Sequence, residues 1–287
     1  MLPVGWAVVP FLMGPSLQAA LDPRAPLFRS SVSAGLWVGW AVVLTATLIP
    51  RTVTLTGVRM VLPAAVLAGV WAAAATPDPG ARDIVAVAWI TLVAALAFAP
   101  FVGEVFVNGS AYGLERRLPL RAPGALLLGP LELTWAAAVV GAVAGPLLLA
   151  DREWIAGVVA LVIGWPLTWW AARSLHGLSR RWLVFTPAGL VLHDPLAAVE
   201  SILVIRRYLA ALGPALADSA ARDLTLGAFG LALEVRLTEA LPISPAPRRR
   251  LRAHDEVTTE EIEAFLFTPT RPGVVLTEAA RRRLRPG

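Results

Sequence analysis

The chain has 287 residues, of which 57% are hydrophobic and 16% charged, and its formal net charge is +5. A typical soluble domain carries about 25% charged residues, so this composition excludes an ordinary water-soluble protein for most of the chain. The sequence contains no cysteine, which excludes disulfides and thiolate-bound metals, and no two of its three histidines are spaced as metal ligands. We therefore predict neither a metal nor any other cofactor.

Charge is distributed unevenly along the chain. Residues 1–175 contain 8 acidic residues and 10 Arg, whereas the shorter part from His176 onward contains 12 acidic residues and 15 Arg. This pattern is typical of a membrane part followed by a water-soluble part. We predict an N-terminal segment over residues 1–31, a transmembrane bundle over 32–175 and a soluble domain over 176–287.

The first 21 residues are apolar, but they have neither a basic n-region nor a small-residue cleavage site. They therefore do not resemble a removable signal peptide. Pro3, Pro10 and Pro15 interrupt the segment, which favours an interfacial or re-entrant conformation. A sixth membrane span is the alternative.

Five later stretches match the roughly 20 apolar residues that a bilayer-spanning helix needs. They are Val32–Ile49, Val53–Ala75, Ile84–Gly103, Glu132–Leu149 and Trp154–Arg173. Eight arginines near the span ends fall on the side of the C-terminus and four on the other side. By the positive-inside rule, the pattern predicts a multi-pass protein of the cell inner membrane with a cytoplasmic C-terminus.

The soluble end changes to the period of β-strands. Residues 182–186 and 190–193 flank a Pro-Ala-Gly turn and predict a hairpin, and residues 201–208 are a third candidate strand. Residues 230–238 alternate between apolar and polar side chains, as a half-buried strand does.

The last 46 residues are expected to contain a linker and two helices. Residues 242–252 are rich in Pro and Arg and predict the linker. Thr258 and Glu261 have the spacing of a capping box, so a helix is expected to begin there, and another over 274–284. The predicted fold class is an α-helical polytopic membrane bundle followed by a small β-rich α+β cytoplasmic domain.

The stretch RRWLVFTPAGL, from Arg180 to Leu190, directly follows the last span. With its strand, threonine-led turn and second strand, it resembles the entry into bacterial pleckstrin-homology-like domains. The resemblance extends to about Ile243 and implies a scaffold or docking role without catalytic residues. The chain as a whole resembles integral membrane proteins of actinobacteria, which implies no particular activity.

Candidate lipid- or ion-binding residues gather around the loop that precedes the fourth of these five spans. Carboxylates near membrane spans are costly and often functional, and a loop with glycines, hydroxyls and arginines suits a lipid headgroup or phosphate. The candidates are Glu104, Asn108, Tyr112, Glu115, Arg116, Arg117, Arg121 and Glu132. In the alternative interpretation, the carboxylates pair with neighbouring arginines, which only fix topology.

Basic residues of the soluble end are candidates for attraction to anionic lipid headgroups. Arg180 and Arg181 follow the last span, and Arg248, Arg249 and Arg250 form a run. Solvated surface charge is the alternative for each cluster. Acidic residues are interleaved, so the soluble end nets only +3 (15 Arg minus 12 acidic residues), which argues against nucleic acid as a partner. The predicted partners are membrane lipids and a membrane protein.

The sequence contains no zinc motif, no phosphate-binding glycine loop and no intramembrane histidine that could serve a serine nucleophile as base. We therefore predict a non-catalytic integral membrane scaffold or regulatory component of the bacterial cell envelope. The alternative is a transporter or lipid-handling protein that uses Glu104, Glu132 and the loop Asn108–Arg121.

Overall fold

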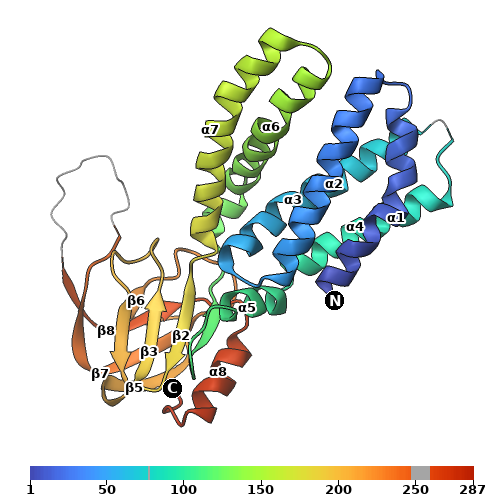
Figure 1. Cartoon of the computed structure of the whole chain (residues 1–287). Coiled ribbons are helices and arrows are strands. Elements are labelled where there is room, and N and C mark those ends of the chain that lie inside the picture. Colours follow the sequence, from blue (N-terminus) through green and yellow to red (C-terminus); the bar gives the residue numbers. More distant parts are fainter. Residues whose placement is uncertain (77, 247–258) are drawn as a thin grey trace. The chain divides into compact units, whose positions relative to one another are not determined.

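The structure is a computed structural model that describes residues 1–76, 78–246 and 259–287. It divides into two compact units (Figure 1). The helical unit comprises Met1–Gly109 and Glu132–His176, and the β-rich unit comprises Ser110–Leu131 and Gly177–Gly287. Each unit is therefore built from two separate stretches of the chain.

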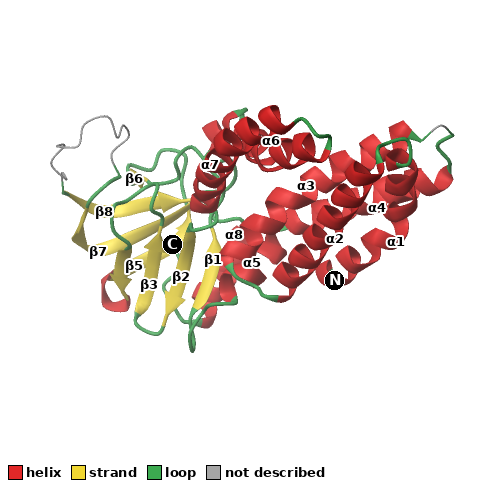
Figure 2. Ribbon diagram, turned by 45° about the horizontal axis from the view of Figure 1, so that its top comes forward, coloured by secondary structure: helices red, strands yellow, loops and turns green. Residues whose placement is uncertain are grey.

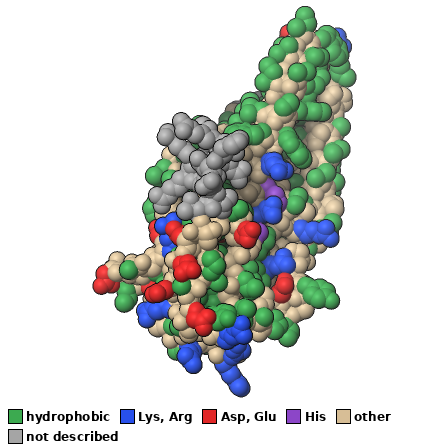
Figure 3. Space-filling view, turned by 90° about the vertical axis from the view of Figure 1, so that its left-hand side faces the viewer, with side chains coloured by type: hydrophobic (Ala, Val, Ile, Leu, Met, Phe, Trp, Pro, Cys, Tyr) green, Lys and Arg blue, Asp and Glu red, His purple; other side chains and the backbone are tan. Residues whose placement is uncertain are grey.

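Six helices in the described part of the chain are long and apolar enough to cross a membrane. They are α1 (Leu2–Leu21), α2 (Pro26–Leu48), α3 (Thr52–Ala75), α4 (Ala81–Phe98), α6 (Pro130–Ala150) and α7 (Trp154–Leu178). Large apolar side chains such as Val38, Leu92 and Ile163 are more than 60% exposed on them. Figure 3 shows mainly hydrophobic side chains on the surface of the helical unit. The prediction of a polytopic helical membrane protein is confirmed.

The N-terminal segment is one continuous helix that its prolines do not interrupt, and its length and hydropathy match the alternative of a sixth candidate span. Pro10 and Pro15 lie inside α1, and membrane bundles tolerate such prolines because neighbouring groups satisfy the freed backbone. The indole N–H of Trp6 donates to the carbonyl of Trp40 at 2.9 Å, and that of Trp40 donates to the carbonyl of Trp6 at 3.2 Å. These contacts and the burial of Met13 place α1 within the bundle as the sixth candidate span.

The predicted span over residues 84–103 is shorter than expected. α4 ends at Phe98, and a separate nine-residue helix, α5 (Pro100–Asn108), follows. Ala99 between them is extended because a residue before proline avoids the helical region. Glu104 and Asn108 therefore lie on α5, outside the six candidate spans.

Helices α6 and α7 cross at two glycines. A Cβ added to Gly141 would lie 2.5 Å from the carbonyl oxygen of Gly164, and one added to Gly164 would lie 2.5 Å from that of Gly141. The hydroxyl of Thr168 donates to the carbonyl of Ala138 at 2.9 Å beside this crossing. Small residues at the contact allow such close backbone approach, which is how membrane helices associate without a hydrophobic driving force.

The β-rich unit contains two four-stranded sheets and a helix (Figure 2). The first sheet has the order β1 (Arg116–Pro119), β2 (Trp182–Thr186), β3 (Gly189–His193) and β4 (Ile202–Ile205), all antiparallel. The second has the order β5 (Leu209–Pro214), β7 (Leu233–Ile243), β8 (Glu260–Phe267) and β6 (Arg222–Asp223). The remaining elements are the 3₁₀ turns η1 (Gly124–Leu127) and η2 (Arg206–Tyr208) and the helix α8 (Pro272–Arg281). Their buried apolar side chains, among them Phe185, Leu233 and Phe265, form one core.

The segment between α5 and α6 belongs to the β-rich unit, not to the membrane bundle as we expected. Its strand β1 pairs along β2, with Arg117 opposite Val184 and Leu118 opposite Leu183. Leu118 and Leu120 are 2% and 6% exposed, and both lie in the core of this unit. The soluble domain predicted over residues 176–287 therefore lacked β1, the edge strand of its first sheet.

Two further expectations for the soluble end are wrong. The helix expected after Thr258 is instead strand β8, whose Phe265 and Phe267 pair with Val235 and Leu233 of β7. The strand expected over 230–238 begins later, at Leu233, and continues to Ile243 into the predicted linker. The hairpin over 182–193 and the last helix are confirmed, while residues 247–252 of the linker and Thr258 lie outside the described residues.

Candidate functional site

A pocket of about 250 Å³ lies between β1 and α8 in the β-rich unit. We call it the basic pocket, and it is lined by Arg116, Arg271, Gly273, Val274, Thr277, Glu278 and Arg281. It is smaller than the roughly 300–1,000 Å³ of typical small-molecule sites, so it suits a group of the size of a phosphate better than a whole metabolite.

The local sequence explains how α8 presents this lining. Pro272 begins the helix, where its missing N–H removes no hydrogen bond. Val275 and Ala279 are buried in the core of the unit, so the helical period turns Val274, Thr277 and Arg281 toward another face. Arg116 reaches the pocket from β1, at the edge of the first sheet.

The charge of the basic pocket is positive. Three arginines and one glutamate line it, a formal charge of +2 (three minus one). Glu278 is 8% exposed and accepts from Nε of Arg282 at 2.7 Å. Arg282 also donates to the carbonyl of Leu114 at 2.7 Å. This hydrogen bond connects α8 to residues 110–131, the part of the β-rich unit between α5 and α6, which we call the inter-span segment. The N-terminus of α8 adds its partial positive charge.

The structure does not bring the lipid- or ion-binding candidates of residues 104–132 together in one site. Only Arg116 lines the basic pocket. Arg117 donates to Ser110 at 3.0 Å and to Glu115 at 3.1 Å, and its guanidinium lies 5.9 Å from the ring centroid of Trp182. Tyr112 is 86% exposed.

Two of the three acidic candidates, Glu104 and Glu132, lie in the helical unit. Glu104 is 7% exposed on α5, and its carbonyl accepts from the side chain of Asn108 at 2.8 Å, while Glu104 has further polar or electrostatic contacts. Glu132 lies exposed in the first turn of α6.

One arginine expected at the membrane surface is buried instead. Arg181 is 2% exposed and forms a two-point ion pair with Asp194, with N–O distances of 2.8 and 2.7 Å. A buried and paired guanidinium cannot face headgroups, so this assignment is wrong. Arg180 and Arg121 are exposed. Arg248, Arg249 and Arg250 lie outside the described residues.

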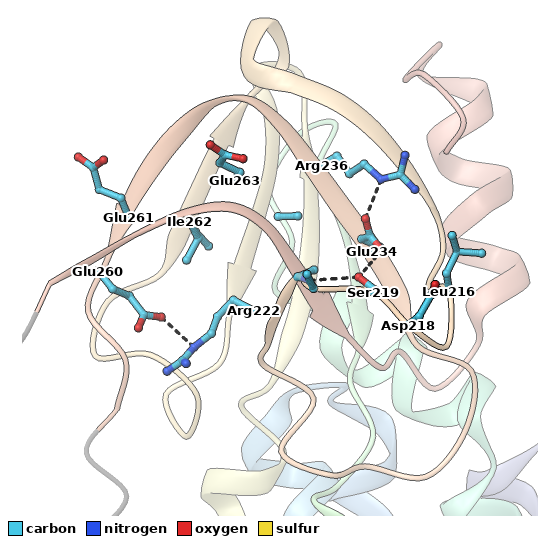
Figure 4. Close-up of a pocket in the computed structure, with 13 residues that line it drawn as sticks. Leu216, Asp218, Ser219, Arg222, Glu234, Arg236, Glu260, Glu261, Ile262 and Glu263 are labelled. Carbon is cyan, nitrogen blue, oxygen red and sulfur yellow. Dashed lines mark hydrogen bonds and ion pairs between the residues drawn. The ribbon is translucent and has the colours of Figure 1, made fainter.

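A second concave site, which we call the acidic cleft, has a volume of about 680 Å³ and lies beside β7 and β8 (Figure 4). Its five acidic side chains are Asp218, Glu234, Glu260, Glu261 and Glu263. Glu234 accepts from Arg236 at 2.7 Å and from the hydroxyl of Ser219 at 2.8 Å, and Arg222 pairs with Glu260 at 2.8 Å. Glu261 and Glu263 project away from these pairs.

These ion pairs give the acidic cleft a structural role. The hydrogen bond from Arg236 is the main reason why the pKa of Glu234 is lowered from its ordinary value. Arg236 and Glu234 both lie on β7, and Ser219 lies in the loop between β5 and β6, so the network holds that loop against the sheet. Across the described ranges, no group of three or more His, Cys, Asp or Glu could hold a metal ion.

Polar contacts inside the helical unit join helices to one another. The ring Nδ1 of His176 lies 3.0 Å from the hydroxyl of Thr56, which connects the end of α7 to α3. The indole of Trp135 donates to the carbonyl of Met60 at 2.9 Å and connects α6 to the same helix. Both contacts fix helix positions.

Sequence reasoning missed Arg271 and Thr277 as members of the basic pocket. Arg281 stands in an arginine run near the C-terminus, but nothing in that run indicates Arg116 as its neighbour. No protein-family model, curated protein or solved structure matches the chain. The chemistry of the basic pocket therefore carries the functional interpretation.

Proposed function

We propose that the protein is a non-catalytic scaffold or regulatory component of the bacterial inner membrane. In this proposal its β-rich unit lies in the cytoplasm and binds a phosphate group in the basic pocket. The observation that carries the proposal is the convergence of Arg116 from β1 with Arg271 and Arg281 of the α8 region around one small cavity. Arginine guanidinium groups recognise phosphate through charge-assisted hydrogen bonds.

The arrangement of spans supports the cytoplasmic position. The two stretches of the β-rich unit are separated by α6 and α7, and two crossings return the chain to the same side of a membrane. That side carries eight of the twelve arginines near span ends. An even number of spans also assigns the N-terminus to this side.

The architecture of the β-rich unit supports a docking role. A hairpin of β2 and β3 follows the last span, and two sheets share one core with a closing helix near the C-terminus. The hairpin is the feature that carries the resemblance to pleckstrin-homology-like domains, and that resemblance implies docking. The lining of the basic pocket offers one hydroxyl, that of Thr277, and no histidine to act on it as a base.

The transporter alternative receives no support from a specific contact. It requires Glu104 and Glu132 along a path through the spans. Glu104 lies on the short helix α5, and Glu132 is exposed in the first turn of α6.

The proposal is tested by binding of glycerol 3-phosphate to the full chain in nanodiscs of neutral phosphatidylcholine, measured by calorimetry. The variant Arg271→Gln/Arg281→Gln should weaken binding by about tenfold or more per arginine, because a hydrogen bond to a charged group contributes about 1.5–3 kcal/mol. The control Arg206→Gln/Arg207→Gln removes the same charge from η2 and should bind as the unchanged protein does.

A second arm distinguishes the source of the phosphate. Nanodiscs that contain phosphatidic acid should block the binding of glycerol 3-phosphate if the ligand is a lipid headgroup, and should leave it unchanged if the ligand is soluble. Equal binding by the pocket variant and the control, or no binding by the unchanged protein in either arm, would overturn the proposal.

A further inference from the structure

An ordered loop between β6 and β7 exposes apolar side chains. Phe229 and Leu231 are 58% and 51% exposed, although both are large and hydrophobic. We call residues 226–231 the apolar loop. Its first residue, Leu226, packs against the core of the β-rich unit. The backbone N–H of Thr225 donates to Asp223 at 2.8 Å, and the backbone N–H of Gly227 donates to the hydroxyl of Thr225 at 3.2 Å.

Two glycines allow the apolar loop and the inter-span segment to touch. A Cβ on Gly124 of η1 would collide with the carbonyl oxygen of Gly227 and would lie 3.2 Å from the ring of Phe229. A Cβ on Gly230 would lie 3.0 Å from Nε of Arg121. Gly230 has a φ of +118°, which favours glycine at this position. The apolar loop is thus held against η1.

The inter-span segment leads directly into a membrane span. Leu127 and Leu128, at the end of η1, are 41% and 78% exposed, and α6 begins at Pro130. Two residues of chain reach at most roughly 7 Å. That is about the thickness of one interfacial layer of a bilayer, whose hydrocarbon core of about 30 Å grows to about 40–45 Å with both headgroup regions. Leu128 therefore lies in or beside the interfacial layer.

We propose that the apolar loop is a second membrane contact of the β-rich unit, with Phe229 and Leu231 inserted among lipids at the bilayer surface. The ring of Phe229 lies against Gly124, which precedes the exposed Leu127 and Leu128 by three and four residues, so the two exposed apolar segments adjoin at this contact. Arg121, beside Gly230, supplies a cation at the base of the loop for headgroup phosphates. An apolar tip with a basic flank is the composition that suits an interfacial position.

The absence of cysteine from the chain gives this proposal a direct test. Single variants Phe229→Cys, Leu231→Cys and Leu128→Cys carry a nitroxide label in the full chain, in nanodiscs of neutral phosphatidylcholine. The control is Leu203→Cys on β4, which is 49% exposed and lies at the opposite edge of the first sheet from β1. Collisions with lipid-soluble O₂ and with a water-soluble nickel chelate are compared at each label.

Labels at 229, 231 and 128 should meet O₂ more readily than the chelate, and the label at 203 should show the reverse. Preference for the chelate at both 229 and 231 would overturn the proposal. Shielding of both from either quencher would also overturn it, because a protein partner would then cover the loop. The test uses neutral lipid and none of the arginines of the basic pocket, so this inference and the proposed function can fail independently.

Discussion

Arg181 and Asp194 form an ion pair inside the β-rich unit, where their side chains are 2% and 0% exposed. The two N–O distances are 2.8 and 2.7 Å, and Nη1 of Arg181 donates to the carbonyl of Arg121 at 2.6 Å. The guanidinium therefore connects the stretch after α7 with the inter-span segment. Asp194 also accepts from the backbone N–H of Leu196 at 3.1 Å.

Removing one member of this pair should destabilise the β-rich unit. Asp194→Ala leaves a buried guanidinium without its counter-charge, which costs about 3–5 kcal/mol, whereas replacing both partners by apolar residues is often neutral. Arg181→Met/Asp194→Leu should therefore be more stable than Asp194→Ala in chemical denaturation of the full chain in detergent. Glu115→Gln breaks the more exposed pair with Arg117 and should cost at most about 1 kcal/mol. A similar small loss for Asp194→Ala would contradict this assignment.

The second stretch of the β-rich unit should not fold alone. A fragment of residues 177–287 lacks β1, so the outer edge of β2 is unpaired and the core lacks Leu118 and Leu120. We expect this fragment to lose cooperative unfolding by circular dichroism. A fragment that joins 110–131 to 177–287 through a flexible Gly/Ser linker should recover it. Equal cooperativity of the two fragments would show that the inter-span segment is dispensable.

The glycine crossing of α6 and α7 should not tolerate a methyl group. Gly141→Ala places a Cβ against the backbone of Gly164, and such overpacking typically costs about 1–3 kcal/mol. Gly35→Ala, in α2, meets no atom within 4 Å and should be neutral or stabilising. Thermal unfolding in detergent measures both, and equal midpoints would contradict the close crossing.

The free energy of unfolding should decrease as the pH falls, because His193 is harder to protonate in the folded protein than in the unfolded chain. Burial lowers the pKa of this half-buried residue and the charge of Arg180 acts in the same direction, while Asp194 opposes them. As the pH falls, the unfolded chain binds the proton first, near the ordinary pKa of about 6.5, so stability is full above that pH and falls below it. His193→Gln should show a smaller loss between pH 7 and pH 5 in denaturant titrations. An identical pH profile for the variant would contradict this role.

The spans could be predicted because a bilayer imposes length and hydropathy on every helix that crosses it. α1 was misread because the penalty for Pro10 and Pro15 was judged without the bundle that accepts them. Strand β8 was misread because Ile262 and Phe265 also have helical spacing, and the decisive pairing with β7 joins residues 17 to 34 positions apart, from Ile243–Glu260 to Leu233–Phe267.

The basic pocket shows the same limit. Arg116 was a candidate, but Arg271 and Arg281 come to it from more than 150 positions away through the packing of α8. One sequence carries no signal for that contact.

The most direct test of the account is the sidedness of single cysteines in the full chain. Tyr112→Cys and Gly287→Cys report the two stretches of the β-rich unit, and Gly80→Cys and Asp151→Cys report loops between candidate spans. A membrane-impermeant maleimide should label positions 80 and 151 in intact cells and positions 112 and 287 only in inverted vesicles. Labelling of 112 and 287 from opposite sides would contradict the two-stretch unit, and labelling of both in intact cells would contradict the cytoplasmic position that we propose for it.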